Sequence, residues 1–108
     1  MEERRKFPRL QTTLRVKYWP LASERPVSAD TKDIGGGVRL VLGEAVKLGA
    51  LLAVELTLPR AGAPMTFVGR VAWCAPAAEP GKFEAGLQFV RIDTKDQQAI
   101  ARFVDASS

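Results

Sequence analysis

Two segments of this 108-residue sequence combine residue types that could bind an anionic ligand. The first is Arg5-Lys6-Phe7-Pro8-Arg9, in which two arginines stand four positions apart and Pro8 restricts the backbone between them. The guanidinium group is planar and always charged, and it can donate two parallel hydrogen bonds to a phosphate or to the O6/N7 edge of guanine. This spacing predicts that Arg5 and Arg9 close on one anionic ligand from two sides.

The second segment is Asp33-Ile34-Gly35-Gly36-Gly37-Val38-Arg39-Leu40, a carboxylate followed by three glycines between two predicted strands. Glycine tolerates positive φ angles and lets a ligand come close to the backbone. The Asp33 carboxylate can accept hydrogen bonds from adjacent N–H donors, such as those at N1 and N2 of guanine. Alone, the stretch is also typical of a hairpin connection with a turn-forming aspartate, so both interpretations stay open at this point.

The positive charge of the chain is concentrated at its N-terminus. The net charge is +4, and residues 1–19 carry six basic and two acidic side chains, whereas residues 20–108 carry ten of each. A local basic segment indicates an anionic partner, such as a nucleotide, a nucleic acid or an acidic protein surface. The alternative is a solvated tail that only keeps the protein in solution.

The composition excludes several classes of function. The chain has no histidine and one cysteine, Cys74, which excludes Ser-His-Asp and Cys-His catalysis, His/Cys zinc sites and an intramolecular disulfide. The acidic residues are scattered, so we expect no catalytic residues, no metal and no enzyme. No apolar stretch approaches the roughly 20 residues that cross a bilayer, and no apolar region follows the N-terminal charges. We therefore expect a cytoplasmic protein without membrane insertion.

Alternating apolar and polar residues predict six strands, because a half-buried strand points successive side chains to opposite faces. The segments are Thr13–Trp19, Arg25–Ile34, Val38–Leu42, Ala50–Leu58, Met65–Cys74 and Lys82–Arg91. Short connections without helices predict antiparallel pairing. The alternation in the fifth segment places Trp73 in the core and Cys74 on the opposite face.

The period changes at the C-terminus. Asp93 or Thr94 can cap a helix, and Ile100, Phe103 and Val104 form one apolar face. We predict a helix at about residues 94–105, which is too short to be stable alone and must pack on the strands. Six strands in a chain of this size predict an all-β, closed or nearly closed barrel. The domain organisation is a basic arm at residues 1–9 followed by one domain at residues 10–108.

Together, the arginine pair, the Asp-Gly turn 24 residues later and the six strands with a terminal helix resemble the PilZ domain family. The resemblance extends from Glu3 to about Val104 and includes Arg70-Val71-Ala72-Trp73 and the final strand at 83–90. It implies a six-stranded antiparallel PilZ-type β-barrel in a bacterial receptor for cyclic di-GMP. In that family the two arginines grip phosphates and guanine edges, and an Asp/Asn-x-Ser-x-x-Gly turn holds the other side of the base.

The resemblance also implies which residues bind the ligand and how the signal is read. The site residues carried over are Arg4, Arg5, Arg9, Asp33, Gly35, Gly36 and Gly37. An arginine directly before the pair, here Arg4, accompanies binding of an intercalated ligand dimer in the family. We expect the arm to become ordered on binding and a downstream protein effector to read that change. No cofactor apart from the ligand is expected, and no DNA or RNA.

One departure weakens the match at the turn. The family pattern reads Asp/Asn-x-Ser-x-Gly-Gly, whereas here the turn after Asp33 is one residue short and has no hydroxyl group. Losing one neutral hydrogen bond would cost about 0.5–1.5 kcal/mol. A second alignment begins at Asp30 and places Lys32 at the serine position, but it breaks the register of the following strand.

Two other functions stay open. The first is a degenerate PilZ-like domain that binds no nucleotide and acts as a protein-protein interaction module. The second is a binder of single-stranded nucleic acid on an OB-like barrel, in which Tyr18 and Trp19 would stack on bases.

Overall fold

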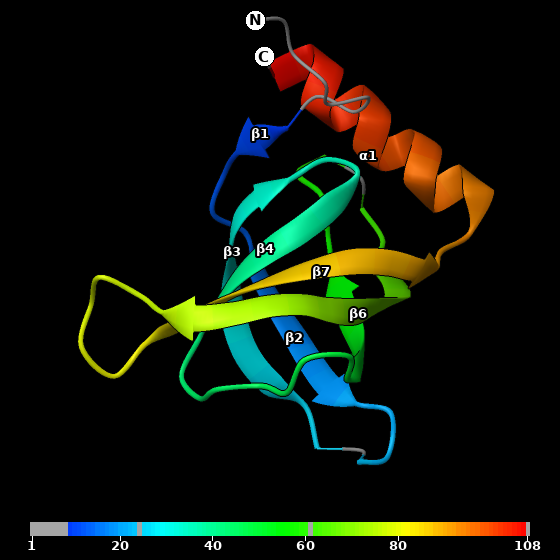
Figure 1. Ribbon diagram of the computed structural model, residues 1–108. Helices are drawn as coiled ribbons and strands as arrows, with labels where there is room; N and C mark the ends of the chain where they lie inside the picture. Colours follow the sequence, from blue (N-terminus) through cyan, green and yellow to red (C-terminus); the bar gives the residue numbers. More distant parts are fainter. Residues whose placement is uncertain (1–8, 24, 61, 108) are drawn as a thin grey trace, which may run out of the picture.

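The computed structural model describes residues 9–23, 25–60 and 62–107. These residues form seven strands and one C-terminal helix (Figure 1). The elements are β1 (Leu10–Gln11), β2 (Arg15–Pro20), β3 (Val27–Ile34), β4 (Gly37–Leu42), β5 (Leu51–Leu56), β6 (Met65–Pro76), β7 (Phe83–Arg91) and α1 (Thr94–Ser107).

Six of the strands close into a barrel. The hydrogen-bonded order β3-β2-β5-β6-β7-β4 is completed by pairing of β4 with β3, and every pair is antiparallel. Closure leaves no free edge among these strands. The predicted six-stranded antiparallel barrel is therefore confirmed. Strand β1 is an addition that the sequence did not predict: its two residues pair with the end of β3, and two residues are too few to show a periodicity.

The alternation of apolar residues builds the core as expected. In β4, Val38, Leu40 and Leu42 are buried, so Arg39 and Val41 between them face outward. The rings of Phe67 and Phe89 meet edge to face with centroids 4.9 Å apart. The fully buried side chains with the largest volumes are Tyr18, Phe67, Ile34, Leu40, Leu42, Leu52, Leu56, Ile100, Val16, Val38, Val54 and Val71.

Helix α1 lies across one end of the barrel, next to β1 (Figure 1). Ile100 and Val104 are buried in the same apolar cluster as the strand residues, and Phe103 packs against it. Asp96 lies in the first turn, where a negative charge is favourable next to the helix N-terminus. The predicted apolar face is thus the one that the helix buries. In the part of the chain that the structure describes, no helix combines the length and the apolar character needed to cross a membrane.

The prediction that Trp73 belongs to the core was wrong. Val71 pairs with Leu87 and Trp73 pairs with Gly86, which leaves Ala72 as an extra, unpaired residue of a β-bulge. One extra residue reverses the alternation, so Trp73 faces outward and keeps 39% of its surface exposed. Cys74, expected on the face opposite Trp73, is half-buried and packs against the core.

Candidate functional site

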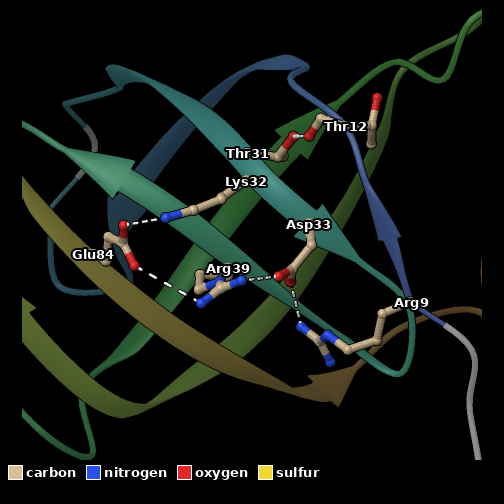
Figure 2. A network of polar contacts seen from close by, with 7 residues as sticks. All are labelled: Arg9, Thr12, Thr31, Lys32, Asp33, Arg39 and Glu84. Atoms are coloured by element: carbon tan, nitrogen blue, oxygen red, sulfur yellow. Dashed lines mark hydrogen bonds and ion pairs between the residues drawn. The ribbon is translucent and has the colours of Figure 1, made fainter. Parts of the chain in front are cut away.

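The centre of the site is the Asp33 carboxylate, which lies near the end of β3 directly opposite Arg39 of β4. Oδ1 of Asp33 accepts a hydrogen bond from Nη2 of Arg9 at 2.6 Å, and Oδ2 accepts one from Nη2 of Arg39 (Figure 2). The fold thus joins Arg9 and Asp33, the two halves of the predicted site that stand 24 residues apart in sequence.

On its other side, Arg39 faces a carboxylate that is itself paired with a lysine. Nη1 of Arg39 lies 3.8 Å from Oε1 of Glu84 on β7, and Oε2 of Glu84 accepts a hydrogen bond from Nζ of Lys32 at 2.6 Å (Figure 2). Nε of Arg39 is buried and has no hydrogen-bond partner among the described residues. The hydrogen bonding of the Arg39 side chain is therefore incomplete. A buried donor without an acceptor lowers the stability of the folded state by about 1–3 kcal/mol.

The two arginines keep Asp33 ionised. The Asp33 side chain is only 6% exposed, and burial by itself would raise the pKa of its carboxyl group. Hydrogen bonds from Arg9 and Arg39, together with their positive charges, outweigh that effect and hold the pKa below its usual value. At neutral pH the site therefore contains two guanidinium groups and one carboxylate in direct contact.

These residues line a pocket of about 770 Å³ on the outer surface of the barrel. This volume is within the range of small-molecule sites. The lining residues come from the residue before β1, from β1, β3, β4, β6 and β7 and from the β3–β4 turn. They are Arg9, Gln11, Asp33, Gly36, Gly37, Val38, Arg39, Ala72, Trp73, Gly86, Leu87 and Gln88. Within residues 9–23, 25–60 and 62–107, no group of three or more His, Cys, Asp or Glu side chains could hold a metal ion.

Two glycines shape the pocket through close contacts. A Cβ atom on Gly37 would lie 2.5 Å from the carbonyl oxygen of Leu87, so glycine is needed for β4 to approach β7. A Cβ atom on Gly86 would lie 2.2 Å from Nε1 of Trp73, so the indole ring rests directly on the Gly86 backbone. None of the three consecutive glycines of the β3–β4 turn has a positive φ, and the conformational freedom of glycine is not used there.

The predicted site residues fall into three groups. Arg9, Asp33, Gly36 and Gly37 all line the pocket. Gly35 instead lines, with Gly36, a second cavity of about 350 Å³ against α1. The remaining two, Arg4 and Arg5, lie outside the described residues.

The alternative alignment that begins at Asp30 places its carboxylate elsewhere. Asp30 accepts a hydrogen bond from Nε of Arg15 at 2.8 Å, and it lines a different cavity. Lys32, which that alignment puts at the serine position, is paired with Glu84. Only the alignment that begins at Asp33 brings its carboxylate to the arginine of the motif.

Sequence reasoning missed the contribution of Arg39, Trp73 and Gly86. Arg39 could have been found, because it stands between buried residues of a predicted strand and follows the glycine turn as closely as Asp33 precedes it. Trp73 could not, since its orientation depends on the bulge at Ala72.

No curated protein matches the sequence. Among solved structures, a Bacillus subtilis inhibitor of motility (MotI/DgrA) superposes with a TM-score of 0.86 at 22% identity, over 98% of this chain and 52% of that one. This chain therefore spans about half the length of that protein. The PilZ domain of CeSA from a cellulose-synthesizing bacterium superposes with a TM-score of 0.66 at 17% identity, over 92% and 96% of the two chains.

At these identities the superpositions show the shared fold. The family assignment comes from the sequence, in which the PilZ domain matches residues 3–106. That match includes the turn after Asp33, both strands that flank the turn and all but the last residue of α1. The chain belongs to the PilZ domain family, whose members are regulatory binding domains known as cyclic di-GMP receptors.

Proposed function

We propose that this protein is a receptor for cyclic di-GMP. The observation that carries the proposal is the contact between Arg9 and Asp33 at 2.6 Å inside a pocket of about 770 Å³. Arg9 and Asp33 belong to the two separate sequence segments that were each predicted to bind an anionic ligand or a guanine base. The membership of the PilZ domain family supports the same ligand.

The residues of the pocket offer complementary groups to each part of the ligand. Cyclic di-GMP carries two phosphate groups with one negative charge each, and the Arg9 guanidinium can bind one of them through two parallel hydrogen bonds. When Arg9 turns to a phosphate, Oδ1 of Asp33 becomes free to accept from N1–H and N2–H of guanine. The Gly36 and Gly37 backbone adds no side chain that would keep the ligand away.

Trp73 supplies a flat apolar surface for a base. Its indole ring is held against Gly86, and Trp73, which lines the pocket, keeps 39% of its surface exposed. Stacking of a nucleic-acid base on an aromatic side chain contributes about 1–3 kcal/mol. An exposed tryptophan fixed in this way gives the site an interaction that neither arginine provides.

The N-terminal arm would connect binding to signalling. Arg4 and Arg5 precede Arg9 in the same basic segment, so a ligand held by Arg9 lies within reach of the arm along the chain. We infer that ligand binding orders this arm and that a downstream protein effector recognises the ordered form. This function implies a bacterial protein that works in the cytoplasm.

One alternative has a specific observation in its favour. Both oxygens of Asp33 already accept hydrogen bonds from arginines, and the turn lacks the serine of the family pattern. A site closed by its own ion pairs would be typical of a PilZ-like domain that binds no nucleotide and acts only through a protein partner.

Calorimetric titration with cyclic di-GMP decides between the two functions. We expect the parent protein to bind, and Arg5→Ala and Arg9→Ala each to abolish measurable binding. Arg15→Ala is the matched control, because Arg15 also pairs with an aspartate of β3 but lies outside the pocket. Thermal unfolding of each variant shows whether the fold is retained. A parent that does not bind, or Arg5→Ala and Arg9→Ala variants that titrate like the parent, would reject the proposed site.

A further inference from the structure

Five residues of the pocket form one continuous row across five strands. Gln11 of β1 pairs with Asp33 of β3, Asp33 with Arg39 of β4, Arg39 with Gly86 of β7, and Gly86 with Trp73 of β6. Directly paired residues of neighbouring strands point to the same face of a sheet. The row therefore lies on the outer face, and all five residues line the pocket.

The row fixes the separation between the indole ring and the charged groups. Neighbouring strands are about 4.8 Å apart, so Trp73 and Arg39, with one strand between them, are about 10 Å apart at the backbone. The residue between them is Gly86, whose missing side chain leaves room that the indole ring occupies. A base stacked on this ring has its edge next to Arg39, and Asp33 is the following residue of the row.

Arg39 has donors to offer at this position. A guanidinium group has five N–H donors. In the structure, Nη2 is bonded to Asp33, Nη1 is 3.8 Å from Glu84, and Nε has no partner among the described residues. Figure 2 shows the group between the two carboxylates, on the same side of the sheet as Arg9. Nε is buried, so the donors that a ligand in the pocket can reach are those at the end of this 29% exposed side chain, where Nη1 is not committed to a strong bond.

We propose that Arg39 is a specificity-determining residue that reads the O6/N7 edge of the guanine base stacked on Trp73. Guanine presents two acceptors, N7 and O6, beside two donors, N1–H and N2–H. Asp33 and Arg39 present the complementary order, a carboxylate beside two or more N–H donors. This inference rests on the proposed function and adds a residue outside both motifs of the family.

The same arrangement disfavours adenine. Adenine presents N7 and the N6 amino group, so a donor would face the Arg39 guanidinium where guanine has the O6 acceptor. A glutamine at this position has both a donor and an acceptor, which is the combination that suits adenine. The choice between the two bases therefore depends on the side chain at position 39.

The test is a pair of calorimetric titrations, with cyclic di-GMP and with cyclic di-AMP, on the parent and three variants. For Arg39→Gln we expect cyclic di-GMP affinity to fall about tenfold or more while cyclic di-AMP affinity stays equal or rises, so that the preference for guanine narrows. Arg39→Lys keeps the charge but not the planar pair of donors, and it should lose most of the preference as well. Arg15→Gln, an arginine that lies outside the pocket, should leave both affinities unchanged.

The ratio of the two affinities separates reading of the base from a general loss of binding. If Arg39→Gln keeps the thermal unfolding midpoint of the parent and binds both ligands more weakly by the same factor, the side chain contributes only positive charge and the proposed role of Arg39 is overturned. An Arg39→Lys variant with the same preference for cyclic di-GMP over cyclic di-AMP as the parent would also overturn the proposed role. A parent that binds cyclic di-GMP and retains its preference in Arg39→Gln rejects Arg39 alone, whereas a parent that binds neither ligand rejects the proposed function and this inference with it.

Discussion

The contact between Trp73 and Gly86 allows the pocket to be tested by adding a single methyl group. In Gly86→Ala the new Cβ atom would lie 2.2 Å from Nε1 and 2.7 Å from Cε2 of the indole ring. Non-bonded atoms pack at about 3.5–4.0 Å, so the ring must retreat by about 1.5 Å or change its rotamer. Because Trp73 is 39% exposed, its ring can move outward while the strands stay paired. We expect the free energy of unfolding to change by less than about 1 kcal/mol.

The effect on binding should be larger than the effect on stability. If the base of cyclic di-GMP stacks on the indole ring, displacement of the ring removes about 1–3 kcal/mol of binding free energy. The dissociation constant should then rise roughly 5- to 150-fold. Calorimetry measures this change directly. Tryptophan fluorescence in a Trp19→Phe background reports on Trp73 alone, since the chain has two tryptophans, and its emission should shift in Gly86→Ala.

Two further variants show whether the methyl group acts through the indole ring. Gly43→Ala is the control, because no atom lies within 4 Å of the Cβ that it would add, and Gly43 does not line the pocket. In the Trp73→Ala background, Gly86→Ala should cost no further affinity, since the clash has been removed. Parent-like affinity in Gly86→Ala, with unchanged emission, would show that the ring is not the surface on which the base stacks.

Three other predictions concern separate parts of the chain. The parent should bind two cyclic di-GMP molecules and Arg4→Leu one, and a calorimetric endpoint of 1:1 for the parent would contradict this. Burial, followed by a hydrogen bond to Glu44, raises the pKa of Tyr18 to about 12; Tyr18 is the only tyrosine, so its absorbance titration should have its midpoint there. The pKa of Tyr18 is near 10 in the unfolded chain, so the protonated hydroxyl group stabilises the fold fully below pH 10. This contribution is lost as the pH rises through about 12, and a denaturation series should show the free energy of unfolding falling by roughly 2–3 kcal/mol. Gly37→Ala places a Cβ 2.5 Å from the Leu87 carbonyl oxygen and should destabilise the fold by about 1–3 kcal/mol, whereas parent-like stability would show that the strands can separate at no cost.

The barrel was predictable because its antiparallel strands bury nearly every second residue. Val38, Leu40 and Leu42 show the pattern in β4, and the period changes only where α1 buries Ile100 and Val104. Each predicted strand overlaps an observed one, and the ends differ by a few residues. Strand ends depend on hydrogen bonds from the turns, which hydrophobic periodicity does not record.

Orientation after a bulge was not predictable in the same way. Periodicity counts residues along one strand, whereas the face of a residue depends on which residue pairs with it across the sheet. Ala72 has no partner in β7, and every residue after it in β6 changes face. A second irregularity leaves Val90 without a partner between Phe89 and Arg91, and Val90 is 45% exposed. Neither residue type indicates a bulge in the sequence.

Residues of the candidate site could be predicted only where a motif marked them in the sequence. Arg9 and Asp33 belong to recognisable patterns, and the structure joins them. Arg39 and Gly86 stand in segments that the sequence also singled out, but no role in the site was assigned to either residue. Their position in the pocket follows from strand register, which places both of them in one row with Asp33.

The β-bulge at Ala72, which hydrophobic periodicity did not predict, also places the aromatic side chain of Trp73 in the pocket. With strict alternation from Val71, the indole ring of Trp73 would point into a barrel interior already filled by Leu87, Ala85 and their neighbours. The extra residue at Ala72 turns the ring outward and sets it opposite Gly86, the one partner in this part of β7 without a side chain to obstruct it. Bulges are enriched next to functional sites because they re-aim single side chains without disturbing the rest of a sheet. The pocket therefore depends on strand pairing as much as on the arginine and aspartate that mark it in the sequence.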